Sequence, residues 1–154
     1  MKIRPLSVQE AAASGCTHSV KIDSDDLTET TNNTAQTISL LPVVNGSVVK
    51  YGGYFLKTPF QDASDAALND TAIEIGDGVV NGRYLGSSQV NENGTEITAG
   101  FTPNSKATAP HAYVAGDNVD IIFGSMAAKA LNDIDTGEIH VFLSLYNFKD
   151  LTNI

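Results

Sequence analysis

The chain has 154 residues and a formal net charge of −9, which gives enough length for one domain with its own core. Its nine Lys and Arg residues form no cluster, which argues against a nucleic acid surface, and its single cysteine excludes an intrachain disulfide and a multi-cysteine metal site. No stretch approaches the roughly twenty apolar residues that cross a bilayer, so we predict one acidic, soluble domain without membrane contact.

The first fifteen residues predict an N-terminal arm. Ser7 and Glu10 have the spacing of a capping box, and three alanines follow before Gly15 ends the run. This pattern predicts one or two helical turns, with a frayed terminus as the alternative. We place the single sandwich domain at residues 16–154.

From Cys16 onward, apolar residues recur with a period of two, which is typical of short antiparallel strands. About eight such runs are separated by Gly, Asn, Asp and Pro, and no helix is long enough to connect parallel strands. The inward positions are expected at Val20, Ile22, Ile38, Leu40, Ile73, Ile75, alternate residues of 95–101, Val119, Ile121 and Phe123. The sequence therefore predicts an all-β fold, an antiparallel, jelly-roll-like β-sandwich with a short N-terminal arm.

Residues 47–58 are apolar at both parities and contain two adjacent glycines, Gly52 and Gly53. A β-bulge at this pair would reconcile the pattern with a single strand. The bulge would place four side chains inside and two lysines outside: Val49, Tyr51, Tyr54 and Leu56 against Lys50 and Lys57. Pro59 is expected to end the strand, because proline lacks an N–H.

The last predicted strand, at residues 138–148, has an unusual outer face. Its inner parity is aliphatic, but the other parity carries Phe142, Tyr146 and Phe148. The solvent side of a sandwich is normally polar, so we expect these rings to be covered by a loop of the same chain or by a neighbouring subunit. They are the candidate subunit interface.

No motif points to catalysis, a cofactor or a metal. His18, His111 and His140 are scattered, and no G-x-S-x-G turn supplies a nucleophile. The acidic residues within 23–26 and 133–138 are interpreted as solvated turns rather than as paired catalytic carboxylates or a calcium loop. We therefore predict a non-enzymatic protein that has no catalytic, cofactor-binding or metal-binding residues.

Four segments in a fixed order carry a family resemblance. They are Val-Val-Lys-Tyr-Gly-Gly-Tyr-Phe-Leu-Lys-Thr-Pro-Phe at 48–60, and then residues 71–76, 112–117 and 137–141. This order resembles the small β-sandwich structural proteins of tailed bacteriophages, of the head-decoration and fibre type, over residues 45–148. The resemblance implies a virion protein, assembled in the host cytoplasm, that forms a homotrimer and binds a major capsid or other virion protein. That family has no catalytic residues to carry over.

Two other classes of function stay open. A carbohydrate-binding module or a receptor-binding domain of a fibre or tail could stack a sugar on an exposed tyrosine, and the chain has five: Tyr51, Tyr54, Tyr84, Tyr113 and Tyr146. A hydrolase would need two carboxylates that converge in one pocket. The function that the sequence and the resemblance together predict is that of a capsid decoration or head accessory protein.

Overall fold

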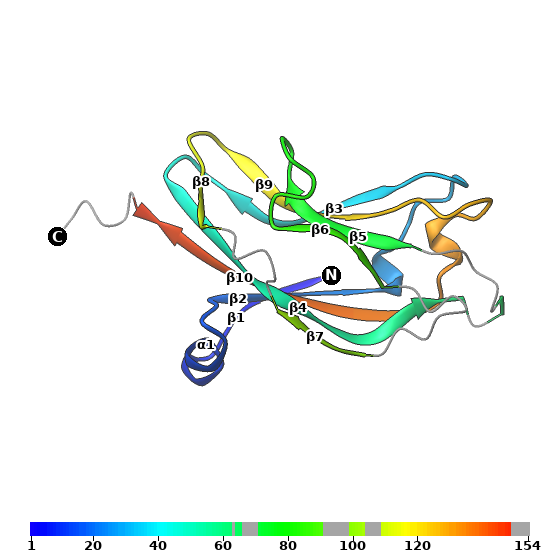
Figure 1. The fold of residues 1–154 in the computed structure, drawn as a ribbon, viewed down its shortest axis with the longest axis horizontal. Helices are drawn as coiled ribbons and strands as arrows, with labels where there is room; N and C mark the ends of the chain where they lie inside the picture. The colour runs from blue at the N-terminus through cyan, green and yellow to red at the C-terminus, as the bar shows by residue number, and fades with distance from the viewer. Residues whose placement is uncertain (63, 66–70, 91–98, 104–108, 149–154) are drawn as a thin grey trace.

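Two antiparallel sheets face each other in the computed structural model (Figure 1). The structure describes residues 1–62, 64–65, 71–90, 99–103 and 109–148. Apolar side chains from both sheets fill the space between them. The predicted all-β, antiparallel sandwich is therefore confirmed.

The larger sheet has six strands and the smaller sheet has four. The larger sheet runs in the order β1 (Lys2–Pro5), β2 (His18–Asp23), β10 (Thr136–Asn147), β4 (Ser47–Gln61) and β7 (Gly100–Pro103), and β8 (His111–Ala112) pairs with another part of β4. The smaller sheet runs in the order β3 (Gln36–Val43), β9 (Asp117–Phe123), β5 (Ala72–Asp77) and β6 (Leu85–Gln89). The predicted jelly-roll connectivity is not confirmed by this order and stays a prediction.

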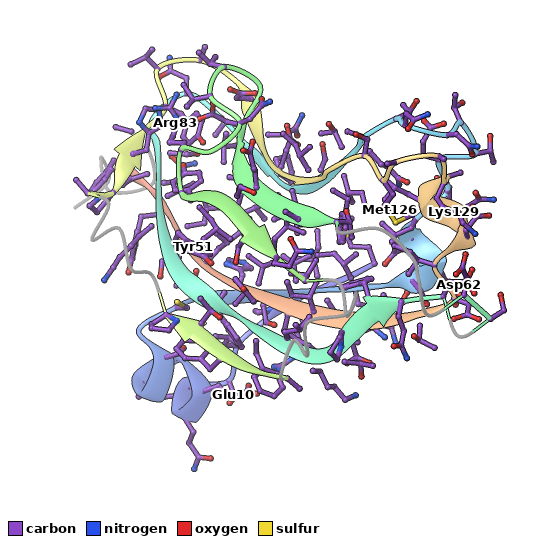
Figure 2. The ribbon with its side chains drawn as sticks, turned by 45° about the vertical axis from the view of Figure 1, so that its right-hand side comes forward. Glu10, Tyr51, Asp62, Arg83, Met126 and Lys129 are labelled. Carbon is purple, nitrogen blue, oxygen red and sulfur yellow. The ribbon has the colours of Figure 1, made fainter. Side chains whose placement is uncertain are left out.

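The core is built from the predicted two-residue alternation. Ile38 is partly buried, and the positions predicted within residues 95–101 are a separate case. The other predicted inward residues are buried: Val20, Ile22, Leu40, Ile73, Ile75, Val119, Ile121 and Phe123. Phe60 of the larger sheet meets Phe123 of the smaller sheet edge to face, with ring centroids 5.1 Å apart. Tyr51 points into the same space (Figure 2).

Phe101 was expected on the inner side, and the structure places it outside. It lies directly opposite Phe55 in the pairing of β7 with β4, and directly opposite residues share one face of a sheet. Phe55 belongs to the outer parity of β4, so Phe101 is also outside and is 56% exposed. The expected alternation at residues 95–98 lies outside the described residues.

β4 contains the predicted bulge. In its pairing with β10, Phe142 lies opposite Gly53 and Leu143 lies opposite Tyr51, so Gly52 is the extra residue. Gly53 has a φ of +132°, which any other residue would adopt only under strain. The bulge distributes the neighbouring side chains as predicted, with four buried and two lysines exposed: Val49, Tyr51, Tyr54 and Leu56 against Lys50 and Lys57.

The prediction that Pro59 ends β4 is wrong, because the strand continues to Gln61. The pairing with β10 is irregular here, since Thr58 lies opposite Glu138 and Gln61 lies opposite Thr136. No register partner is assigned to residue 59, so its missing N–H costs no ladder hydrogen bond.

The N-terminal residues form more structure than a helical arm. α1 (Val8–Ser14) begins at the predicted capping box of Ser7 and Glu10. Before it, Lys2–Pro5 forms the edge strand β1 and pairs with β2. This strand was missed because all four of its residues are exposed and show no alternation. Two 3₁₀ turns complete the helical segments: η1 (Ser24–Asp26) and η2 (Leu131–Asp133). None of the helices in the described part of the chain has the length and apolar character of a membrane span.

The bulge generates a first prediction. Replacing Gly53 by alanine would force a side chain into a left-handed backbone conformation, with its Cβ 2.6 Å from the Thr102 carbonyl oxygen. We expect Gly53→Ala to lower the free energy of unfolding by roughly 1–3 kcal/mol in urea denaturation. Gly100→Ala is the matched control, because a Cβ there meets no atom within 4 Å. Equal stability of the two variants would contradict the assigned bulge.

Candidate binding face

Three phenylalanines from adjacent strands lie on the outer side of the six-stranded sheet. They are Phe55 of β4, Phe101 of β7 and Phe142 of β10. The helix α1 lies on the same side (Figure 1). The rings of Phe101 and Phe142 meet edge to face, with centroids 6.2 Å apart and an interplanar angle of 62°. Phe55 and Phe101 are 38% and 56% exposed. Phe142 is half-buried, so the cluster presents two exposed rings beside a third that is partly covered. Contiguous exposed apolar surface of this kind is a feature of binding sites.

The strand register brings these three rings together. Phe55 and Phe101 are direct partners, as described above, and Phe142 lies opposite Gly53, which has no side chain. The Phe142 ring therefore has room beside the bulge to lean toward Phe101. We call these three residues the phenylalanine cluster.

A hollow of about 380 Å³ opens beside the phenylalanine cluster. Its lining adds the end of α1 and the bulge to the three rings: Ser14, Cys16, Gly52, Phe55, Phe101 and Phe142. A second hollow of about 300 Å³ shares Ser14 and Phe142 and extends under α1 to Arg4 and His140. The outer face is thus recessed on both sides of Phe142, and the walls of the first hollow are mainly apolar.

Cys16 is part of the packing at the first hollow. A Cβ on Gly52 would collide with the Cys16 Sγ atom, so the thiol lies directly over the bulge. The side chain is only 3% exposed, and burial raises the pKa of its thiol. A thiol that is buried and protonated is a poor nucleophile.

The structure separates the three residues predicted as a subunit interface. Between Phe142 and Tyr146, the Ser144 hydroxyl donates to the Gly15 carbonyl oxygen at 2.9 Å, and Ser144 is fully buried. Gly15, directly after α1, therefore lies over β10 between the two rings. Phe142 joins the phenylalanine cluster, while Tyr146 and Phe148 lie farther along and are 47% and 52% exposed.

Sequence reasoning missed two members of the phenylalanine cluster. Phe55 lies two residues before Lys57, which the bulge hypothesis already placed outside. Extending the outer parity from Lys57 back to Phe55 would have identified it. Phe101 could not be found in this way, because its face depends on the register between β7 and β4.

Charged pairs surround the phenylalanine cluster. Arg4 binds Glu10 with both terminal nitrogens, at 2.8 and 2.6 Å. Glu138 accepts from Lys57 at 3.0 Å and lies 2.7 Å from a ring nitrogen of His140. His140 and Lys57 hold the pKa of the Glu138 carboxyl below its ordinary value. These pairs fix long side chains around an apolar centre, in the way that a polar rim surrounds a binding face.

Lys50 differs from these residues, because it makes no ion pair in the part of the chain that the structure describes. It lies directly opposite Ser144 on the outer face and is exposed. It also lies close enough to Cys16 for its charge to lower the thiol pKa slightly, against the larger effect of burial. A positive charge without an ion-pair partner among the described residues therefore lies near Cys16, which lines the hollow.

A second polar cluster, which the sequence did not predict, lies near the turn between β5 and β6. The Asp77 carboxylate is 1% exposed and accepts from Arg83, from the Tyr113 hydroxyl at 3.1 Å and from the backbone N–H groups of Val79 and Val80. The Tyr84 hydroxyl lies 2.7 Å from that of Tyr113. The carboxylate joins the turn to the segment after β8, and Asp77, Arg83 and Tyr113 line a hollow of about 270 Å³.

The environment of this cluster shifts its pKa values. Burial alone would raise the pKa of Asp77, but hydrogen bonds from Arg83, the turn backbone and Tyr113 outweigh burial and hold the pKa below its ordinary value. Burial raises the pKa of Tyr84 to about 12. Burial raises the pKa of Tyr113 as well, and the neighbouring Tyr84 and Asp77 add to the shift. Both tyrosines therefore stay protonated and donate hydrogen bonds.

The three histidines lie in different environments. His18 contacts the Thr17 hydroxyl at 2.7 Å, His111 contacts Arg83 at 3.4 Å, and His140 pairs with Glu138. Within the described ranges, no three His, Cys, Asp or Glu side chains are placed to hold a metal ion. Of the five tyrosines, only Tyr146 is exposed, and four are buried: Tyr51, Tyr54, Tyr84 and Tyr113.

Comparison of the chain with models of protein families, with curated proteins and with solved structures finds no match.

The Asp77 cluster predicts a measurable stabilisation by Tyr113. Tyr113→Phe removes the bond to Asp77 and leaves the buried Tyr84 hydroxyl without its partner. We expect a loss of about 1–2 kcal/mol in the free energy of unfolding, measured in urea. Tyr146→Phe is the matched control, because Tyr146 is 47% exposed, and it should change stability little. A Tyr113→Phe chain as stable as the control would show that the hydrogen bonds do not contribute.

The lowered pKa of Asp77 also predicts acid sensitivity. A carboxyl whose folded pKa is below its unfolded value of about 3.9 stabilises the fold above that pH. The stabilisation is lost as the pH falls through the folded pKa. We expect Asp77→Asn to be less stable than the natural chain at pH 7, with a smaller difference between them at pH 3. Urea titrations at both pH values measure this, and a difference that does not change with pH would contradict it.

Proposed function

We propose that this protein is a non-enzymatic structural protein of a phage particle, a capsid decoration or head accessory protein that associates with copies of itself. The observation that carries the proposal is the phenylalanine cluster, with its hollow, on the outside of the six-stranded sheet. In this proposal the protein is located in the virion as a homotrimer and binds a major capsid or other virion protein.

The form of the outer face supports a role in assembly. Rings at the centre, charged pairs around them and a recess at their side are features of protein interfaces. Phe101 is 56% exposed on an edge strand, where burial by a partner would remove apolar surface from water. Each fully buried phenylalanine contributes roughly 1.5–3 kcal/mol.

The polar groups support a binding role rather than a catalytic one. Asp77, the most buried carboxylate with a lowered pKa, is already saturated by internal donors. Each histidine has a different neighbour, and Cys16 is buried. Catalysis would require a nucleophile or an acid–base pair that is accessible in a pocket.

The phage setting comes from the resemblance of four segments in the sequence. All four segments overlap strands of the sandwich: residues 48–60 lie in β4, 71–76 overlap β5, 112–117 run from the end of β8 to the start of β9, and 137–141 lie in β10. The resemblance thus concerns the framework of the fold, and the phenylalanine cluster supplies the binding surface that a decoration protein needs.

The proposal is tested by the mass of the protein in solution. Sedimentation velocity over a range of concentrations should show species heavier than the 16.2 kDa chain. The double variant Phe101→Ser/Phe142→Ser should shift the distribution to monomer, because it removes two rings of the phenylalanine cluster. Val114→Ser is the matched control: Val114 is 86% exposed but lies outside this face.

A natural chain that stays monomeric at every concentration would overturn self-association. Circular dichroism of the double variant confirms that its sheets still form. Co-sedimentation with phage heads that lack the protein would test the particle role, and a chain that does not bind them would contradict it.

A further inference from the structure

The charges of the molecule are divided between two surfaces. The structure describes seven of the basic residues, and five of them lie on the outer side of the six-stranded sheet: Lys2, Arg4, Lys21, Lys50 and Lys57. Three of the described acidic residues lie on the same side: Glu10, Asp23 and Glu138. This basic face is therefore net positive, whereas the other described residues comprise two basic side chains against eleven acidic ones.

The strand register places these basic residues. Lys2 lies directly opposite Lys21 in the pairing of β1 with β2, and Lys21 lies opposite His140 of β10. His140 in turn lies opposite Phe55. Opposite residues share a face of the sheet, so these four residues form one row across the outer side. The row joins the lysines of β1 and β2 to the phenylalanine cluster.

The opposite charge is concentrated at one end of the sandwich. Three loops meet there: the Ser24 hydroxyl donates to the Asp135 carbonyl at 3.1 Å, and the Asp135 N–H donates to the Gln61 carbonyl at 3.1 Å. The loops carry seven acidic residues: Asp25, Asp26, Glu29, Asp62, Asp65, Asp133 and Asp135. We call this region the acidic end. It joins the two acidic clusters of the sequence, which are more than a hundred residues apart.

Little positive charge balances the acidic end. Lys129 pairs with Asp65 at 2.7 Å and feels the charges of Asp62 and Asp133, and the Met1 ammonium contacts Asp26. Figure 2 shows Asp62 and Lys129 at this end and Arg83 at the other. Asp25 and Asp133 are exposed.

We propose that the basic face of one copy binds the acidic end of a second copy. This inference rests on the proposed self-association and names the surface that covers the phenylalanine cluster. Lys50 and Lys57 pair with carboxylates of the neighbouring chain around the buried rings. Because the two surfaces differ, the contact is heterologous, and repeated contacts close into a ring, such as a trimer, or extend as an open chain.

Charge complementarity favours this arrangement over its alternatives. Two basic faces placed against each other would bring like charges together, which costs several kcal/mol. The outer side of the four-stranded sheet is also acidic, but Asp120 there is mostly buried and bonded to Ser39 at 2.8 Å. The acidic end offers exposed carboxylates, and its positive neighbours among the described residues are Lys129, the Met1 ammonium and Lys21, which interacts with the charge of Asp26.

Charge reversal on each surface tests the inference. The face variant is Lys50→Glu/Lys57→Glu, and the end variant is Asp25→Lys/Asp133→Lys. We expect each variant alone to associate at least about tenfold more weakly than the natural chain, measured by sedimentation velocity at 50 mM salt. An equal mixture of the two should recover association, since the intact basic face of one meets the intact acidic end of the other.

Glu74→Lys is the matched control, because it reverses a charge on the four-stranded sheet and should leave association unchanged. Raising the salt to 1 M should weaken association of the natural chain and of the mixture alike. Circular dichroism establishes that each variant is folded before its mass is interpreted.

The outcomes separate this inference from the proposed function. If the natural chain associates and the end variant still associates as strongly, the partner surface is wrong but self-association stands. Loss of association in Glu74→Lys would assign the contact to the four-stranded sheet and overturn the inference in the same way. If the natural chain is monomeric throughout, both fail.

Discussion

The glycine bulge of β4 is the constraint on which both faces of the six-stranded sheet depend. One extra residue at Gly52 lets Tyr51 and Tyr54 both point inward, and it places Phe55 on the outside opposite Phe101. The missing side chains make room for Cys16 above Gly52 and for Phe142 opposite Gly53. The core and the phenylalanine cluster are therefore two consequences of one local irregularity, and the cluster could not form on a regular strand.

The fold uses its polar groups in two ways. Asp77 and its partners are satisfied internally and stabilise the turn between β5 and β6, where an unpaired buried charge would be costly. Charges on the outer side of the six-stranded sheet and at the acidic end remain partly exposed and are separated by sign. In the proposed contact between copies, this separation would set the orientation of one copy against the next.

Local patterns in the sequence predicted the features that depend on neighbours in the chain. The two-residue alternation identified the buried positions of β2, β5 and β9, and the two glycines identified the bulge. Features that depend on distant residues were missed. Tyr113 reaches Asp77 across 36 positions, and Phe101 acquires its face only by pairing with Phe55. Lys2–Pro5 forms a strand only because β2 offers it an edge.

The proposed interface between copies is the phenylalanine cluster. The buried phenylalanines of the same chain serve as an internal control for it. Uniform 4-fluorophenylalanine labelling gives six ¹⁹F resonances, assigned by single replacements. As concentration rises, the account predicts that the signals of Phe55, Phe101 and Phe142 shift or broaden, while those of the buried Phe60 and Phe123 do not. Six resonances that are all independent of concentration would contradict it.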